Sequence, residues 1–258
     1  MKSSCLLCLL VCIPATLSAA DNSKAPGRAP KSDFDPIDRY VEKQIEGWKV
    51  LVHQVLLTPE HRELCDQTLK LLDDHLYRIA RVAPEQALTK LRQIPIWVEL
   101  AHPKHPCMCY HVSADWLREN GMNPQKAGAV EIANAKNFLK WTHEQPWMVL
   151  HELAHGYHHQ VLGYDHKEIH ACYEEAKASK SYEAVLHWDG RKVRAYALTN
   201  DQEYFAELTE AYFGTNDFYP FVRAEVKQHD PKMYQILEKV WGVRSRKKEV
   251  KGEADKPK

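Results

Sequence analysis

The chain has 258 residues, of which 35 are basic, 35 are acidic and 44% are hydrophobic. This length allows one domain with a sizeable core. The balanced charge is unevenly spread, because residues 244–258 hold seven basic and three acidic residues and leave residues 34–243 mildly acidic. An acidic body disfavours a nucleic-acid-binding surface, so we expect no nucleic-acid partner.

The N-terminus has the pattern of a secretory signal peptide. Lys2 precedes an apolar run over residues 6–13, and Ser18 and Ala20 supply the small residues that signal peptidase requires. A membrane anchor would need an apolar stretch closer to ~20 residues. We therefore predict a signal peptide over residues 1–20, a secreted protein (extracellular or periplasmic) and no stable membrane insertion after cleavage.

Composition divides the rest of the chain into three segments. Residues 21–35 are rich in Pro, Ser, Lys and Gly and predict a flexible linker. Residues 244–258 have almost no apolar side chains and predict a disordered basic tail. Residues 36–243 are left as one catalytic domain.

Four cysteines remain after removal of the predicted signal peptide: Cys65, Cys107, Cys109 and Cys172. An even number in an oxidising compartment favours up to two disulfides, with buried thiols as the alternative.

Hydrophobic periodicity predicts the elements that precede the centre of the chain. They are a strand over 47–57, a helix over 60–79, a shorter helix opened by Pro84 and Glu85, and strands over 94–100 and 128–134. Residues 101–127 predict irregular structure. Its histidines His102, His105 and His111 lack a metal-site spacing, which favours structural or exposed roles over metal binding.

Residues 146–163 predict a central helix that begins near Pro146, ends at Gly163 and carries His151, Glu152 and His155. Residues four apart on a helix point the same way, so His151 and His155 can bind one ion. Glu152 lies beside them and can take a proton from a water on that ion. The pattern indicates a hydrolase with one Zn²⁺ and with Glu152 as general base.

The third zinc ligand has two candidates. Glu174, with Glu175 beside it, stands at the distance from His155 that aminopeptidase-like and thermolysin-like enzymes use. Glu203 lies in a predicted helix over 199–213, where it shares one face with Glu207 and Glu210. We favour Glu203 as the ligand, and we expect Glu207 to accept a hydrogen bond from His151 in the second shell of the metal.

Two further predictions concern the same part of the chain. His158 and His159 follow the metal motif but cannot wrap around the same ion from one straight helix, so we expect supporting or surface roles. The aromatic and aliphatic residues of 231–241 predict a last helix that closes the core.

Three features together resemble a known family: HELAH at 151–155, EYFAE at 203–207, and Tyr196 seven residues before Glu203. They are similar to the zinc catalytic domain shared by anthrax lethal factor and the bacterial Pro-Pro endopeptidases, a gluzincin family. The resemblance implies an α+β, zincin-like metallopeptidase domain, with a small mixed sheet, an HExxH helix and a second helix that bears the Glu ligand.

The same resemblance implies roles for particular residues. His151, His155 and Glu203 would bind the zinc ion, and Tyr196 would stabilise the oxyanion. Residues 128–134 would form the edge strand along which a peptide lies.

The sequence thus predicts a secreted zinc endopeptidase that acts on a peptide or protein substrate. The alternatives are an aminopeptidase-like enzyme with Glu174 as third ligand, and a zinc-containing binding protein without catalytic activity.

Overall fold

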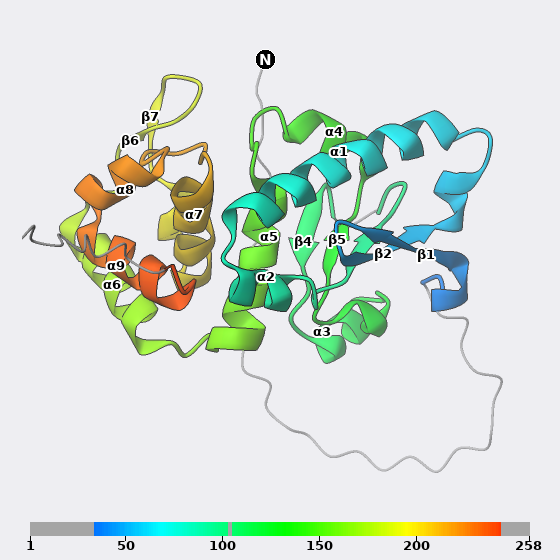
Figure 1. The fold of residues 1–258 in the computed structure, drawn as a ribbon, viewed down its shortest axis with the longest axis horizontal. Helices are drawn as coiled ribbons and strands as arrows, with labels where there is room; N and C mark the ends of the chain where they lie inside the picture. Colours follow the sequence, from blue (N-terminus) through cyan, green and yellow to red (C-terminus); the bar gives the residue numbers. More distant parts are fainter. Residues whose placement is uncertain (1–33, 103–104, 244–258) are drawn as a thin grey trace, which may run out of the picture. The chain divides into compact units, whose positions relative to one another are not determined.

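The structure is a computed structural model that describes residues 34–102 and 105–243 (Figure 1). The predicted signal peptide (1–20), most of the predicted linker (21–35) and the predicted basic tail (244–258) lie outside the described residues. Within the described ranges the chain combines a small mixed sheet with several helices, which confirms the predicted α+β class.

The main sheet has five strands in the order β1-β2-β3-β5-β4. Its strands are β1 (Tyr40–Ile45), β2 (Trp48–His53), β3 (Ile96–Val98), β4 (Met108–Tyr110) and β5 (Val130–Ile132). β1 and β2 form an antiparallel hairpin, β2, β3 and β5 run parallel, and β4 lies antiparallel to β5. A separate two-stranded ribbon contains β6 (Val185–Leu186) and β7 (Lys192–Val193).

Alternating side chains give the main sheet two different faces. One face contributes residues such as Val50, Ile96 and Val130 to the main core, where they are fully buried. The opposite face carries a smaller cluster of Leu51, Trp97 and Ala129. The register places Leu51 beside Trp97 and Trp97 beside Glu131, so Glu131 points to this second face.

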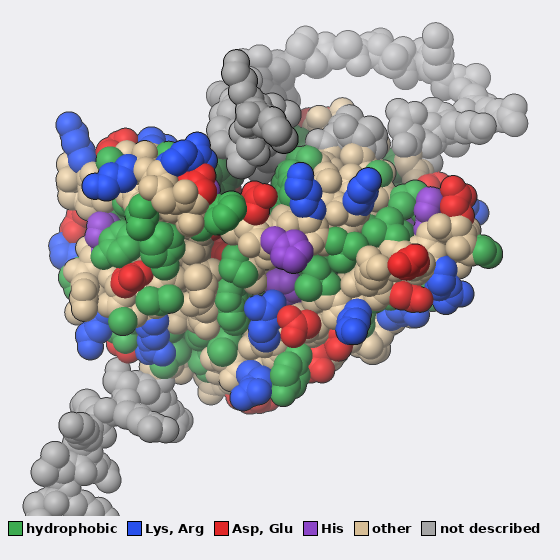
Figure 2. All heavy atoms as spheres, turned by 90° about the horizontal axis from the view of Figure 1, so that it is seen from above, with side chains coloured by type: hydrophobic (Ala, Val, Ile, Leu, Met, Phe, Trp, Pro, Cys, Tyr) green, Lys and Arg blue, Asp and Glu red, His purple; other side chains and the backbone are tan. Residues whose placement is uncertain are grey.

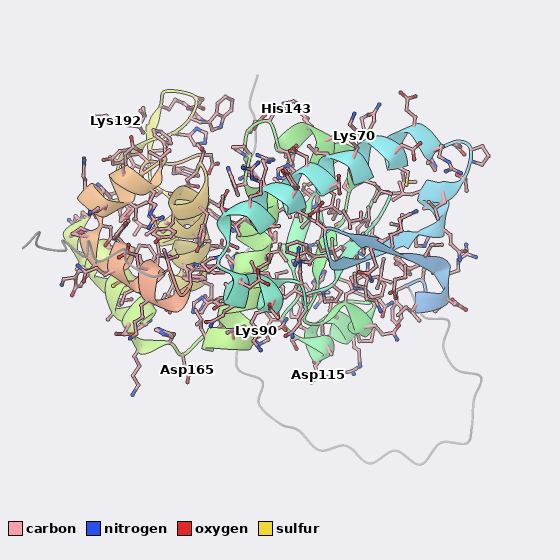
Figure 3. All side chains as sticks on the ribbon, viewed as in Figure 1. Lys70, Lys90, Asp115, His143, Asp165 and Lys192 are labelled. Carbon is pink, nitrogen blue, oxygen red and sulfur yellow. The ribbon has the colours of Figure 1, made fainter. Side chains whose placement is uncertain are left out.

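The helices occupy most of the remaining chain. They are α1 (Arg62–Val82), α2 (Glu85–Leu91), α3 (Ala114–Glu119), α4 (Ala135–Trp141), α5 (Met148–Tyr157), α6 (Lys167–Ser179), α7 (Asp201–Phe213), α8 (Arg223–His229) and α9 (Pro231–Val240). Helix α5 continues into a π-helix over His158–Leu162. Figure 3 labels exposed side chains that mark several of these regions: Lys70 on α1, Lys90 on α2, Asp115 on α3, His143 after α4, Asp165 before α6 and Lys192 in β7.

Helix α5 has packing partners on two sides (Figure 1). It packs against α1, α2 and the strands β4 and β5, and on its other side it packs against α7. Trp241, directly after α9, packs onto α5 and α7. Its ring stacks on Tyr157 at 4.3 Å and on Phe205 at 5.8 Å between ring centroids. This agrees with the predicted closing helix over 231–241.

Several elements were not predicted from the sequence, and one predicted strand has a different position in the sheet. Strand β1 has a largely polar, exposed sequence, and the region predicted to be irregular contains β4 and α3. Helices α4, α6 and α8 were also not predicted. The predicted edge strand over 128–134 is wrong: β5 lies inside the sheet between β3 and β4, and the edge strand beside it is β4. Strand order depends on long-range pairing, which local periodicity does not encode.

The predicted disulfides are also absent from the described residues. Cys65 in α1, Cys107 in the bend before β4 and Cys172 in α6 are buried thiols, and no disulfide joins the four described cysteines. The alternative of buried thiols therefore holds for these three residues.

None of the helices within residues 34–102 and 105–243 is both long enough and apolar enough to cross a bilayer. On the face shown in Figure 2, basic and acidic side chains are interspersed. The absence of a nucleic-acid partner stays a prediction.

Gly214 allows α7 to lie close to the start of α5. A Cβ atom at this position would come within 1.8 Å of Cε2 in the Trp147 indole ring. Trp147 is the residue directly before α5, and Gly214 is the residue directly after α7. Any larger side chain must therefore push the two helices or the indole ring apart.

We expect Gly214→Ala to lower the free energy of unfolding by about 1–3 kcal/mol, as overpacking does in other cores. Urea denaturation followed by circular dichroism measures the change. In a Trp147→Ala background the same substitution should cost about 0.5 kcal/mol or less, because the obstructing ring is gone. An equal cost in both backgrounds would show that Gly214 is not required for this contact.

Candidate active site

Two helices supply the side chains of the candidate site. His151 and His155 lie one turn apart on α5, as their spacing predicts, and Glu203 lies in the first turn of α7. The Asn200 side chain accepts a hydrogen bond from the Glu203 backbone N–H at 2.8 Å and caps α7 at its start. This cap fixes where Glu203 meets the histidines.

The three donor atoms of these side chains converge. His151 Nε2 lies 3.0 Å from His155 Nε2 and 3.0 Å from Glu203 Oε2, and His155 Nε2 lies 3.2 Å from the same oxygen. A tetrahedral ion with bonds of about 2.0–2.1 Å separates its ligands by roughly 3.3 Å. The donor set and its spacing therefore fit zinc, and three protein ligands match the open sites of catalytic zinc.

Glu203 is held in its charged form. Burial favours the neutral acid, but the imidazoles of His155 and His151 hold the pKa of Glu203 well below its usual range. Only 16% of its side chain is exposed, and the two histidines are exposed by 11–12%. An anionic, largely desolvated carboxylate is suited to bind a metal ion.

The second nitrogen of His151 makes its closest contact with Glu210. His151 Nδ1 lies 2.7 Å from Glu210 Oε1 and 3.8 Å from Glu207 Oε1. In this structure Glu210 therefore takes the hydrogen bond that was predicted for Glu207. Seven residues turn a helix by about 700°, within ~20° of two full turns, whereas four residues overshoot one turn by ~40°. Glu210 thus lies more nearly below Glu203 than Glu207 does.

Three buried acids lie behind His151. Burial raises the pKa of Glu210 to about 7 and that of Asp217 to about 6. Burial, together with Asp217 and Glu210, also raises the pKa of Glu207 well above its usual value. Asn216 donates a hydrogen bond to Glu207 at 3.1 Å. Asn216 and Asp217 were not predicted, because they lie in a loop after α7 without a recognisable motif.

Glu152 and Tyr196 complete the candidate site. The Glu152 carboxylate makes no hydrogen bond or ion pair with the described part of the chain, although it follows His151 directly. Tyr196 donates a hydrogen bond to Glu203 Oε1 at 3.3 Å. Burial and the nearby carboxylates of Glu203 and Glu152 raise the pKa of Tyr196, so its phenol remains a hydrogen-bond donor.

The structure separates the competing carboxylates from the histidines. Glu174 and Glu175 are exposed on α6, where they pair with Lys177 and Lys232. Among the described residues, the group of metal-binding type that contains both His151 and His155 has Glu203 as its carboxylate. The geometry thus favours Glu203 over Glu174.

The histidines that follow the motif have supporting positions. His158 is 1% exposed and packs against Phe205 and Tyr164. His159 Nδ1 lies 2.9 Å from the Tyr110 hydroxyl, which ties the π-helix to strand β4.

Comparison with known proteins places these helices within a described family. The family model for the anthrax toxin lethal factor, N- and C-terminal domain, matches residues 84–240. The matched residues are more than half of the chain and include β4, α5 and α7. No curated protein and no solved structure matches the chain.

Replacement of Glu210 tests the contact with His151. We expect Glu210→Gln to weaken zinc binding by about 10- to 100-fold, because the metal-binding imidazole loses its carboxylate partner. The matched variant Glu207→Gln should change the affinity by less than about threefold. Competition with a chromophoric chelator measures both values. A larger loss of zinc affinity in Glu207→Gln than in Glu210→Gln would support Glu207 as the hydrogen-bond partner of His151.

Proposed function

The chain belongs to the family of the anthrax toxin lethal factor N- and C-terminal domain, and we propose that it is a secreted zinc-dependent endopeptidase with a zincin-like fold. The proposed zinc ligands are His151, His155 and Glu203. Glu152 is the proposed general base, and Tyr196 is the proposed oxyanion donor.

One observation carries this proposal: the ligand atoms of His151, His155 and Glu203 converge, and the neighbouring residue Glu152 has no hydrogen-bond or ion-pair partner within the described residues. A purely structural zinc site fills its fourth position with protein and needs no base. Here two histidines and Glu203 supply three donors. Glu152 is adjacent in sequence and makes no ion pair within the described residues. This arrangement supports hydrolysis rather than a structural role.

Glu152 takes and returns a proton in the proposed reaction. When bound, zinc supplies a Lewis acid that activates water and polarises the scissile carbonyl. The Glu152 carboxylate accepts the proton of the attacking water. The resulting carboxylic acid then delivers this proton to the amine that leaves, so Glu152 returns to its charged form.

Tyr196 meets the negative charge that develops on the carbonyl oxygen. Its hydroxyl already points toward the metal-ligand group, where it contacts Glu203 at 3.3 Å. A short turn over Tyr196–Leu198 directly before α7 holds the phenol in place. In the transition state the hydroxyl turns from Glu203 to the oxyanion and donates its hydrogen bond there.

We propose that the backbone of the substrate binds along the edge strand β4. The Cys107 carbonyl accepts a hydrogen bond from the Ala133 N–H, and the His111 N–H donates to the Ala129 carbonyl, so both residues face the neighbouring strand. The alternation of an antiparallel ladder then turns the backbone groups of Met108 and Tyr110 toward the outer edge. A peptide can pair with this edge as an added strand. This role falls to β4 and not to residues 128–134.

The proposed export rests on the N-terminal sequence. The apolar run over residues 6–13 and the small residues before position 21 have the pattern of a signal peptide. The proposed zinc chemistry does not depend on this part of the chain.

The Glu152→Gln variant tests the proposed function. We expect wild-type protein to cleave internal bonds in a peptide library, and we expect the variant to lose about 10²–10⁴-fold in rate, because glutamine cannot accept the proton. Mass spectrometry identifies the products. The zinc content should be the same in both proteins, since Glu152 is not a ligand.

Two outcomes would contradict the proposal. Equal zinc content without any difference in cleavage would indicate a zinc-binding protein without catalytic activity. Products shortened by single N-terminal residues would indicate an aminopeptidase instead of an endopeptidase.

Tyr196→Phe removes only the proposed oxyanion donor. We expect kcat to fall by about 100-fold or more, with little change in KM or zinc content. The matched control is Tyr182→Phe, because the buried Tyr182 hydroxyl donates to Asp230 at 3.1 Å and not to a proposed metal ligand. A parallel rise in KM, or an equal loss in the control, would indicate that Tyr196 has a structural role.

A further inference from the structure

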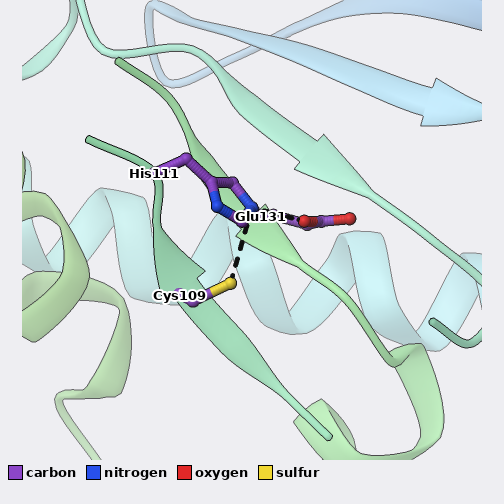
Figure 4. A group of neighbouring side chains, drawn as sticks. All are labelled: Cys109, His111 and Glu131. Atoms are coloured by element: carbon purple, nitrogen blue, oxygen red, sulfur yellow. Dashed lines mark hydrogen bonds and ion pairs between the residues drawn. The ribbon is translucent and has the colours of Figure 1, made fainter. Parts of the chain in front are cut away.

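A second group of metal-binding side chains lies on the face of the sheet away from the main core (Figure 4). Cys109 lies in β4, His111 follows it by two residues, and Glu131 lies in β5. Residues two apart in an extended chain point to the same side. Cys109 is also paired directly with Glu131 across the two strands. The strand register therefore brings sulfur, nitrogen and oxygen donors together.

The donor atoms of this group are close enough to share one ion. His111 Nε2 lies 2.5 Å from Glu131 Oε2 and 3.6 Å from Cys109 Sγ. All three donor atoms lie within 4.8 Å of one another. Glu131 is fully buried and His111 is only 4% exposed, so bulk water does not compete strongly for these groups.

Lys126 and Glu99 determine the charge around this group. Lys126 contacts Glu131 through Oε1, which leaves Oε2 directed at His111. Lys126 also donates to Glu99 at 2.6 Å. The proton shared by His111 and Glu131 balances the remaining carboxylate charge, so a divalent ion enters this region only as protons leave it.

His105 is available as a fourth donor. Its ring packs against the His111 ring at 5.7 Å between centroids. The His105 Nδ1 atom is buried and has no hydrogen-bond partner among the described residues. The His105 nitrogens lie outside the group of donor atoms that are within 4.8 Å of one another, so His105 becomes a fourth ligand when its ring moves toward the group.

We propose that Cys109, His111 and Glu131 bind a second zinc ion, with His105 as the fourth ligand. Thiolate, imidazole and carboxylate donors together suit zinc, and four protein ligands make a closed, structural site. Zinc displaces the proton of the Cys109 thiol and the proton shared by His111 and Glu131. Two protons leave as one divalent ion enters, so the net charge is unchanged.

This ion would hold the edge strand β4 in place from the face of the sheet that lies opposite to α5. Cys109 points to the second face, whereas its neighbour Tyr110 points to the main core and contacts His159 on the π-helix. The second zinc would therefore hold β4 against β5, while the other side of β4 packs on α5. Its role is to position the strand, and it takes no part in the reaction.

Metal counting on the full-length protein tests the proposal. After saturation with zinc and removal of the excess, we expect two zinc ions per wild-type chain and one per Cys109→Ser chain. The matched control Cys172→Ser makes the same chemical change on α6, away from the group, and should retain two. One zinc in the wild type, with no change in Cys109→Ser, would overturn the proposal.

Cobalt substitution gives a spectroscopic readout of sulfur ligation in the wild-type protein itself. A thiolate bound to Co²⁺ produces a charge-transfer absorption in the near ultraviolet, and the His151, His155 and Glu203 site contains no sulfur. We expect this band in the wild type, in Cys172→Ser and in Glu203→Ala, and we expect its loss in Cys109→Ser. A wild type without the band, or a band that persists in Cys109→Ser, would overturn the proposed ligand set.

These measurements are independent of the proposed peptidase activity. A protein that cleaves no peptide can still bind the second ion, and an active enzyme can lack it. Failure of one proposal is therefore distinguishable from failure of the other.

Discussion

The close contact between α5 and α7 is the constraint on which the candidate site depends. Neither helix carries a complete set of ligands, because α5 brings two imidazoles and α7 brings the carboxylates. The helices approach closely only because Gly214 has no side chain where it meets Trp147. This approach removes water from Glu203 and Glu210, and the loss of water makes their contacts with His151 strong.

The parts of the site that follow from helical spacing could be predicted from the sequence. The HELAH motif places His151 and His155 on one side of any α-helix, and the structure brings them together. Glu203 could be singled out because its own helix has a recognisable cap and a repeated acidic face. Such signals are local, so they do not require knowledge of the strand order or of the angle between helices. The match to the lethal factor family agrees with the resemblance that these residues carry.

The remaining features depend on how distant segments meet. The choice of Glu210 over Glu207 is decided by the way α7 crosses α5, and both residues satisfy the same sequence pattern. The order of β4 and β5 is set by long-range pairing, so the edge strand could not be found from alternation within residues 128–134. The cysteine count suggested disulfides, but Cys65 and Cys172 lie in different helices, which sequence spacing cannot reveal.

The donor atoms of the candidate site come from two different helices, and this affects the stability of the fold. His151 and Glu203 are 52 residues apart, so they meet only when the chain is folded. An ion that binds the folded form and not the unfolded form stabilises the fold, by about 2.7 kcal/mol when its free concentration is 100 times Kd. At the proposed site, scarcity of the ion would therefore weaken the fold itself, through the same contact between α5 and α7 that brings the donor atoms together.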